Sequence, residues 1–303
     1  MSIDLPVMDQ RSHAQHRWLL ASLVLIWAIS WPALKVGVTS TPPIWFSFWR
    51  YAIAAVCLFA FLAARRRLAF PPRHDWPLVV VSGALQMAAY SALTGSALGV
   101  LPPGRASILA FSTPIWVVPI SAWWLRERLP RAGLLGVGLG LCGALAIAAP
   151  SLRSAERETL AYALLMGAAA AWAVSIVFVR AHRFRASALT LAPWQMLVAV
   201  VLLLPIALVM EGPPPPLATK ALLSLAYVAP VATAFAYWAV VEVGRRFAAS
   251  TVSMALLATP ALGLLISSLA FHEEVGASLL LGLALIGSGI RLATRPAAAQ
   301  DLR

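Results

Sequence analysis

Long apolar stretches, each wide enough to cross a lipid bilayer, occupy almost the whole sequence. A helix needs about 20 apolar residues to span a hydrocarbon core about 30 Å thick, and charged or Pro/Gly-rich breaks separate ten such stretches in the 303 residues. Hydrophobic residues make up 61% of the chain and charged residues only 11%, whereas about 25% of the residues in an average soluble domain are charged. The chain is therefore predicted to be an all-α integral membrane protein, and an ordinary globular enzyme, a disordered chain and a disulfide-linked secreted scaffold are excluded.

The predicted transmembrane helices leave room for little besides a membrane bundle. They cover residues 18–38, 45–64, 76–98, 106–125, 133–149, 159–179, 189–210, 222–241, 251–271 and 276–293. Most connections are shorter than twelve residues, so no inserted soluble domain is expected. The predicted organisation is an N-terminal tail (1–17), a first group of five helices (18–149), a linker (150–158), a second group of five (159–293) and a C-terminal tail (294–303).

Basic residues predict the orientation of the chain. The two tails and the connections after every second helix carry 17 Lys and Arg residues, whereas the other connections carry 4. Because cytoplasmic loops are enriched in Lys and Arg, both termini are predicted to be cytoplasmic. This distribution also accounts for the formal net charge of +12, so no nucleic-acid partner is expected.

The two groups of helices share residues at a constant spacing. The matching pairs, at an offset of 145 or 146 residues, are Trp27 with Trp172, Thr113-Pro114 with Thr259-Pro260, and Glu127 with Glu273. An ordered series of this kind indicates an internal repeat. Since each unit has an odd number of helices, the second copy has to enter the membrane upside down, which is the inverted-repeat architecture of many secondary transporters.

A recurring pattern of proline, glutamate and glycine links the chain to a known family. In the first half the pattern comprises Pro42-Pro43, Arg50, Arg105-Ala106-Ser107, Thr113-Pro114, Arg126-Glu127-Arg128, Gly136, Gly140 and Gly143. In the second half it comprises Ser253, Thr259-Pro260, Glu273 and Gly282. Over nearly its whole length the chain resembles the EamA family of the drug/metabolite transporter superfamily. The resemblance implies two inverted five-helix repeats in a bacterial inner membrane and, for most members, export of amino acids or related metabolites, with aromatic amino acid exporters as one branch.

The interior of the predicted bundle lacks acidic residues and histidines. All 11 acidic residues and all 5 histidines fall in connections, tails or helix edges, whereas a carboxylate or imidazole at membrane depth is the usual proton relay of an ion-coupled transporter. We therefore predict a facilitator or exchanger, with Na⁺ binding by backbone carbonyls of broken helices as an open alternative. The same absence argues against catalysis, so no catalytic residue, metal or cofactor is expected.

Candidate substrate-binding residues lie on helices predicted to face the space between the two copies. They are Trp27, Trp31, Tyr90, Ser107, Phe111, Trp172, Tyr237 and Ser253. Tryptophan and tyrosine combine an apolar face with a polar group, and serine hydroxyls can bind a polar solute. Interhelical packing is the competing interpretation for each ring, and a bond to a carbonyl of the same helix is the competing interpretation for each serine.

Three further residues are predicted to act in gating or in helix kinks. Pro114 and Pro260 each remove one helical hydrogen bond, which bends a helix. Arg50 lies within the second predicted helix, where its guanidinium could close a gate on helix-end carbonyls or contact the substrate. Lys35 is the other cation inside a predicted helix and is expected to extend to the membrane interface.

These features predict a secondary transporter that works by alternating access on small amphipathic metabolites, in the first place neutral or aromatic amino acids. A broad-range drug or metabolite efflux protein coupled to an ion gradient is the alternative within transport. A membrane-embedded enzyme or lipid-handling protein would need catalytic groups that the predicted helices do not contain. The expected partners are a small-molecule substrate and the lipid bilayer, and the protein is expected to be a monomer or a homodimer.

Overall fold

The computed structural model describes residues 10–126, 131–149, 156–247, 252, 255–256 and 258–293. Within these residues the regular structure is entirely helical and contains no β-strand. The helical segments are α1 (Gln10–Ser40), α2 (Pro43–Ala64), η1 (Arg73–Asp75), α3 (Trp76–Val81), η2 (Ser82–Ala89), α4 (Tyr90–Val100), α5 (Pro103–Ala110), α6 (Thr113–Trp124), α7 (Arg131–Ala148), α8 (Glu156–Ala181), α9 (Ala188–Met210), α10 (Thr219–Val228), η3 (Pro230–Phe235), α11 (Ala236–Arg246), α13 (Ala258–Phe271) and α14 (Ala277–Ala293).

Eight stretches of the described chain are long and apolar enough to cross a membrane. They are Gln15–Ser40, Pro43–Ala64, Arg73–Val100, Pro103–Trp124, Arg131–Ala148, Glu156–Ala181, Ala188–Met210 and Thr219–Gly244. Two shorter apolar helices, Ala258–Phe271 and Ala277–Leu292, follow them. The helical membrane fold is thus as the sequence predicts, while the full number of ten crossings stays a prediction.

Three of these stretches are irregular in their middle. η2 and η3 are π-helical, and a shift of 146 residues carries positions 82–89 onto positions 228–235, so the two irregular segments occupy equivalent places in the two halves. Short π-helical insertions are uncommon and concentrate at functional sites. The third break separates α5 from α6 at Phe111 and Ser112.

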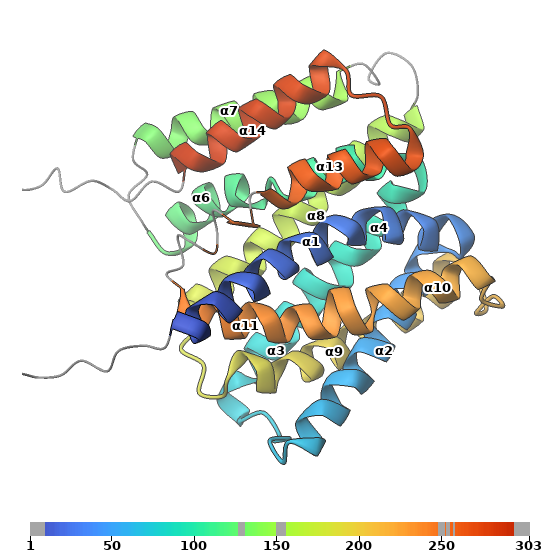
Figure 1. Ribbon diagram of the computed structural model, residues 1–303, viewed down its shortest axis with the longest axis vertical. Coiled ribbons are helices and arrows are strands. Elements are labelled where there is room, and N and C mark those ends of the chain that lie inside the picture. The colour runs from blue at the N-terminus through green and yellow to red at the C-terminus, as the bar shows by residue number, and fades with distance from the viewer. Residues whose placement is uncertain are drawn as a thin grey trace, which may run out of the picture.

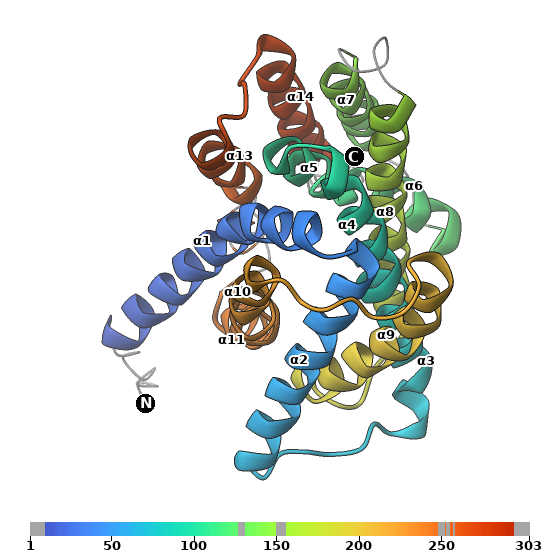
Figure 2. The same ribbon diagram turned by 90° about the vertical axis from the view of Figure 1, so that its right-hand side faces the viewer.

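The helices pack in pairs that join the first half of the chain to the second. α7 lies against α14 at one edge of the bundle and α2 against α9 near the opposite edge (Figure 1). α1 packs on α10, α11 and α13, and α8 packs on α4, α5 and α6. Figure 2 shows α2 crossing between α10 and α11 on one side and α9 on the other.

Glycines allow the backbones of α7 and α14 to touch. A Cβ added at Gly143 would lie 2.8 Å from the carbonyl oxygen of Gly282, and one added at Gly289 would lie 2.5 Å from the carbonyl oxygen of Gly136. Small residues at such spacing are the usual means by which membrane helices approach closely. The close α7–α14 pair therefore depends on the absence of side chains at these positions.

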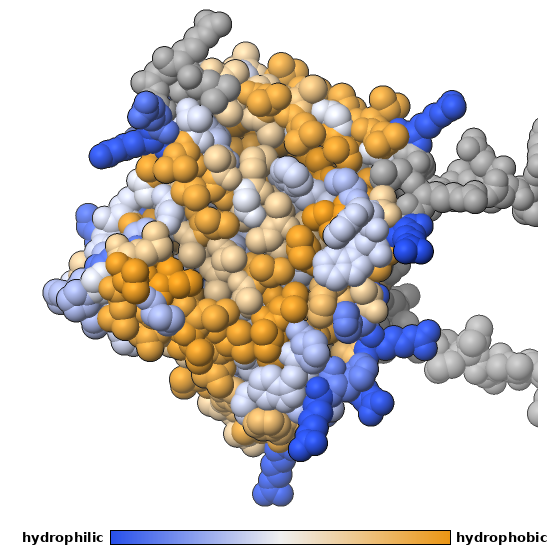
Figure 3. All heavy atoms as spheres, turned by 180° about the vertical axis from the view of Figure 1, so that it is seen from behind, coloured by the Kyte–Doolittle hydropathy of each residue, from blue (hydrophilic) through white to orange (hydrophobic). Residues whose placement is uncertain are grey.

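The start of α1 and the end of α14 lie at the same end of the bundle (Figure 1). We call this the termini end, and the opposite end, where α4 ends and α5 begins, the far end. On the face drawn in Figure 3, apolar side chains cover the middle and the strongly hydrophilic ones lie towards the two ends, most of them at the termini end. This apolar band between polar ends is the surface expected of a bundle embedded in lipid.

Three carboxylates at the edges of the bundle each hold the start of another helix. Asp75 accepts hydrogen bonds from the backbone amides of residues 185 and 186, ahead of α9. Glu211 accepts from the amides of residues 44 and 45, in the first turn of α2. Glu273, 7% exposed, accepts from those of residues 104 and 105, in the first turn of α5. Helix starts present unpaired N–H groups and a partial positive charge, so each carboxylate is stabilised where it lies and links distant parts of the chain.

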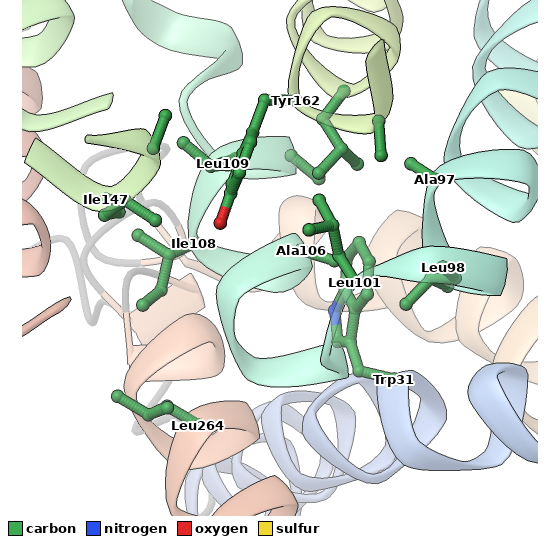
Figure 4. Packing of buried hydrophobic residues seen from close by; sticks show 14 of the residues in the cluster. Trp31, Ala97, Leu98, Leu101, Ala106, Ile108, Leu109, Ile147, Tyr162 and Leu264 are labelled. Atoms are coloured by element: carbon green, nitrogen blue, oxygen red, sulfur yellow. The ribbon is translucent and has the colours of Figure 1, made fainter. Parts of the chain in front are cut away.

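The largest apolar core lies where α1, α4 and α5 meet α7 and α8. Trp31 is 4% exposed and points from α1 towards Leu101 and Ala106 at the α4–α5 junction (Figure 4). The ring of Tyr162 on α8 enters the same core beside Leu109. This packing fixes the far-end half of α1 against the connection between α4 and α5.

Candidate functional site

A group of polar and aromatic side chains from both halves of the chain lies between the helices. This central cluster consists of Arg50 and Tyr51 on α2, Gln86 on η2, Tyr90 on α4, Trp172 on α8, Thr233 on η3 and Tyr237 on α11. Tyr51 and Thr233 are buried, and the other members keep part of their surface accessible. Partly accessible groups in the interior of a bundle are available to a bound molecule.

The Arg50 guanidinium reaches from α2 to the π-helical segment η3. Its Nε donates a 2.8 Å hydrogen bond to Thr233 Oγ1, and the Thr233 hydroxyl donates to the carbonyl oxygen of Val228, five residues earlier and 2.8 Å away. The hydroxyl is therefore held by the irregular backbone of η3. Arg50 Cζ also lies 5.2 Å from the ring centroid of Tyr51, whose hydroxyl shares a 2.9 Å hydrogen bond with Ser91 Oγ.

Two further tyrosines lie near the guanidinium, and one of them binds a glutamine. Arg50 interacts electrostatically with both Tyr90 and Tyr237. The Tyr237 hydroxyl lies 3.3 Å from Gln86 Nε2 and accepts its hydrogen bond. Hydrogen-bonding groups of α11 and η2, which belong to different halves of the chain, thus meet next to a positive charge.

Trp172 borders the cluster on the side of α8. Its ring lies edge-on to that of Tyr90, with centroids 5.0 Å apart and an interplanar angle of 71°, a favoured geometry for an aromatic pair. One turn further along α8, Ser175 Oγ lies 3.5 Å from Gln86 Oε1. Aromatic faces and polar groups therefore adjoin in one place, which suits a molecule with an apolar part and a polar part.

Trp27, the predicted counterpart of Trp172, contacts the other irregular segment. Its Nε1 donates a 3.2 Å hydrogen bond to the carbonyl oxygen of Ala232 in η3, and its ring packs with Leu23, Ala236 and Ala239. Trp27 thus touches η3, and Trp172 touches Tyr90 directly after η2. The two tryptophans occupy matching places against the two π-helical segments.

Three other predicted site residues are not members of the central cluster. Trp31 and Phe111 are ring neighbours, with centroids 6.3 Å apart, in the core against which Tyr90 also packs. Ser107 is completely buried, and its hydroxyl donates a 2.7 Å hydrogen bond to the carbonyl oxygen of Gly104 in its own helix. In this structure the Ser107 hydroxyl is thus engaged by its own backbone and is not part of the cluster.

The predicted kink prolines lie in α6 and α13. Pro114 is the second residue of α6 and directly follows the break at Phe111 and Ser112. Pro260 is buried in α13. Ser253 and Glu127 lie outside the described residues.

Lys35 and Glu273 hold the connection between α4 and α5 at the far end. Lys35 Nζ donates hydrogen bonds to the carbonyl oxygens of Leu98, 2.6 Å away, and Leu101, 3.1 Å away. Glu273 binds the first turn of α5, just beyond these carbonyls, and interacts electrostatically with Lys35. We call this arrangement the far-end clasp. The contacts expected from a gating arginine, those with helix-end carbonyls, are thus made by Lys35, whereas Arg50 binds a side-chain hydroxyl.

Three members of the central cluster were not among the predicted site residues. Gln86 and Thr233 each lie four residues before a predicted site tyrosine, a spacing that places both side chains on one helix face, but only the tyrosines were predicted to bind substrate. Tyr51 carries no such signal, because only the packing of α2 on α4 brings its hydroxyl to Ser91. Within the described residues, no group of three or more His, Cys, Asp or Glu side chains is placed to hold a metal ion.

Comparison with known proteins assigns the family. The model of the EamA-like transporter family matches residues 17–149 and, a second time, residues 159–295. The chain belongs to the EamA-like transporter family. The resemblance found in the sequence is thus confirmed, and this EamA-like transporter is a membrane protein whose partners are a small-molecule substrate and the lipid bilayer.

Several relatives match the EamA-like transporter over most of its length. YoaV, an uncharacterized transporter of Bacillus subtilis, is 29% identical over 278 residues, which cover 91% of this chain and 95% of YoaV. A "Probable terminal-alkyne amino-acid exporter" of Streptantibioticus cattleyicolor is 28% identical over 280 residues, which cover 92% of this chain and 93% of the exporter. A "Probable amino-acid metabolite efflux pump" of Escherichia coli is 24% identical over 280 residues, which cover 88% of this chain and 91% of the pump.

A solved crystal structure shares the fold. It superposes with a TM-score of 0.61 at 22% sequence identity and covers 93% of this chain and 97% of its own. The family and the named relatives are transporters rather than enzymes.

Proposed function

We propose that this EamA-like transporter exports small amphipathic metabolites, with neutral and aromatic amino acids as the first candidates. The observation that carries the proposal is the central cluster, in which the paired rings of Trp172 and Tyr90 adjoin the hydrogen-bonding groups of Gln86 and Tyr237. The aromatic or aliphatic side chain of a substrate can pack on these rings, while its polar groups form hydrogen bonds with the Gln86 amide and the Tyr237 hydroxyl. The names of the relatives, an amino-acid exporter and an amino-acid metabolite efflux pump, support the same class of substrate.

The proposed architecture is a pair of inverted five-helix repeats with ten membrane crossings. The double match of the family model supports two copies, as do the equivalent positions of η2 and η3. The packing supports it as well, because α8 meets α4 and α6 as α1 meets α11 and α13. With an odd number of helices in each copy, the second copy is inverted. The distribution of Lys and Arg supports a cytoplasmic termini end, and the bacterial relatives support the inner membrane.

Alternating access is the proposed mechanism, with the substrate between the two repeats. The far-end clasp closes one end, because α1 packs against α4 and α5 there. In the described part of the chain the equivalent pair at the termini end, α8 and α11, is not packed in this way. The structure is therefore interpreted as a state closed at the far end. Since the central cluster contains no acidic residue or histidine, the proposed transporter is a facilitator or exchanger.

Uptake into sealed liposomes tests this proposal. Purified protein is reconstituted, and radiolabelled amino acids are added with and without a proton or sodium gradient. We expect accumulation only to equilibrium, unchanged by either gradient, with the strongest uptake for neutral or aromatic side chains. Accumulation driven by a gradient would overturn the facilitator assignment, and the absence of uptake for every amino acid would overturn the substrate class.

Tryptophan variants test the location of the site in the same assay. Trp172→Ala removes the ring that packs on Tyr90, and Trp27→Ala removes the donor to η3, so both are expected to lower uptake about tenfold or more. Trp123→Ala is the matched control, because this ring is 81% exposed near the end of α6, and it should transport like the wild type. Undiminished uptake in both Trp172→Ala and Trp27→Ala would place the substrate elsewhere.

A further inference from the structure

Among the described residues, the charge of Arg50 has no carboxylate counter-ion. Its Nε is bound to the Thr233 hydroxyl and its Cζ lies over the Tyr51 ring, but no carboxylate of a described residue lies within the 4.0 Å of an ion pair. The terminal Nη groups of Arg50 have no hydrogen-bond acceptor within the described part of the chain. An arginine side chain remains charged in proteins, so it cannot become neutral to avoid this situation.

Other charges at the edges of the bundle are matched by backbone groups. Lys35 binds carbonyl oxygens at the end of α4, and Asp75, Glu211 and Glu273 each bind two consecutive backbone amides. The chain thus compensates these charges by helix ends. Arg50 lies further inside, where α2 meets the middle of the stretch formed by α10, η3 and α11.

The aligned position in the second half of the chain carries no charge. At the offset of 145 residues that aligns Trp27 with Trp172, Arg50 aligns with Gln195 on α9. Gln195 is 8% exposed, so the equivalent place in the second half accommodates a neutral amide in a buried setting. A charged residue in only one of the two copies points to a role beyond packing.

The surroundings of Arg50 are suited to a planar anion with an apolar part. The neighbouring side chains are those of Tyr51, Tyr90 and Tyr237, none of which is a carboxylate that would compete for the guanidinium. The parallel N–H groups of a guanidinium match the two oxygens of a carboxylate, and such paired, charge-assisted hydrogen bonds are strong in a site of low dielectric constant.

We propose that Arg50 binds the carboxylate of the transported molecule and restricts this protein to substrates with a free carboxylate group. The inference rests on the proposed function and refines it, because it names the group that every substrate must carry. An α-amino group is then dispensable, whereas conversion of the carboxylate to an amide removes recognition. Cationic amphiphiles that lack a carboxylate are excluded as substrates.

Competition by two analogues tests the requirement in the wild-type protein. Liposomes are preloaded with unlabelled phenylalanine, and their uptake of labelled phenylalanine by exchange is measured. The competitors are 3-phenylpropionate, which lacks the amine, and phenylalaninamide, which lacks the free carboxylate. We expect 3-phenylpropionate to inhibit the exchange at a concentration about tenfold or more lower than phenylalaninamide, because one charge-assisted hydrogen-bonded pair contributes an affinity difference of that size. Equal competition, or stronger competition by the amide, overturns the proposal.

Substitutions assign the requirement to Arg50. In Arg50→Gln the preference for the carboxylate over the amide should fall to within about twofold, and Arg50→Lys, which keeps the charge but not the paired geometry, should lie between Arg50→Gln and the wild type. Thr233→Val removes the acceptor of Nε and leaves the guanidinium, so transport falls while the preference for the carboxylate remains. An unchanged preference in Arg50→Gln assigns recognition to another residue and overturns the proposal.

A binding measurement separates this inference from the proposed function. In detergent, 3-phenylpropionate should raise the melting temperature of the wild type but not that of Arg50→Gln. If the wild type transports no amino acid yet shows this Arg50-dependent stabilisation, the proposed substrates are wrong and the carboxylate site stands. If 3-phenylpropionate and a panel of other small carboxylates stabilise wild type and Arg50→Gln equally, or neither of them, the carboxylate site is refuted.

Discussion

Removing the Glu273 carboxylate should destabilise the protein, because this one side chain, from the second half of the sequence, holds the start of α5 at the far end of the bundle. Its Oε2 accepts from the Gly104 amide at 2.9 Å and from the Ser267 hydroxyl, and its Oε1 accepts from the Arg105 amide at 3.0 Å. Oε1 also lies 3.9 Å from Arg105 Nε. The carboxylate is thus the acceptor of a buried network.

The structure sets the size of the effect. In Glu273→Ala the Gly104 amide keeps its 3.1 Å hydrogen bond to Ser267 Oγ. The interactions that are lost are those of Arg105, whose backbone amide and guanidinium no longer have the carboxylate as a partner. Breaking a buried ion pair costs about 3–5 kcal/mol, and a hydrogen bond to a charged group contributes about 1.5–3 kcal/mol. We expect a loss of about 3–5 kcal/mol for Glu273→Ala and about 1.5–3 kcal/mol for Glu273→Gln, which retains one acceptor oxygen.

Thermal unfolding in detergent, followed by the fluorescence of the 12 tryptophans, measures the difference. At about 2 °C per kcal/mol for a chain of this size, the melting temperature should fall by about 6–10 °C in Glu273→Ala and by about half as much in Glu273→Gln. Glu274→Ala is the matched control, because this neighbouring side chain is exposed and should change stability by no more than about 0.5 kcal/mol. Equal melting temperatures for Glu273→Ala and Glu274→Ala would refute the reasoning.

Two further substitutions test the packing with matched controls. Gly289→Ala places a Cβ 2.5 Å from the carbonyl oxygen of Gly136 and should destabilise by about 1–3 kcal/mol, whereas Gly287→Ala, which meets open space, should be neutral or raise the melting temperature; an equal effect would mean that α7 and α14 do not touch. Lys35→Met removes the bonds to the end of α4 and should cost about 1–3 kcal/mol, whereas Lys220→Met changes an exposed side chain and should have no measurable effect; equal melting temperatures would exclude a stabilising clasp.

The residues that formed the central cluster were predicted unequally well. Tyr90, Trp172 and Tyr237 could be named from the sequence, because large amphipathic rings are conspicuous in helices made of small apolar residues. The position of Arg50 inside a helix was also evident, but its partner was not. Thr233 lies 183 residues away in the chain, and no local pattern relates the two.

Irregular backbone was the least predictable part of the fold. Pro114 marks a break in the chain between α5 and α6, and Pro230 opens η3, but no proline accompanies η2. Hydropathy reports only that a stretch is apolar and long enough, and a π-helical turn changes neither its length nor its composition appreciably. The equivalent positions of η2 and η3 became apparent only when both were seen in the structure.

The sequence by itself determined the membrane class, the helical content and the family of this transporter, because the absence of water in lipid forces every long apolar stretch to satisfy its backbone hydrogen bonds within a helix. It also located most of the helices, since their ends coincide with charged and proline-rich breaks. Only the tertiary structure decided which charges are paired. Helix ends at the bundle edges compensate Lys35, Asp75, Glu211 and Glu273. Arg50 has no carboxylate partner among the described residues and lies beside rings from both halves of the chain. That distinction depends on distances between segments far apart in the chain.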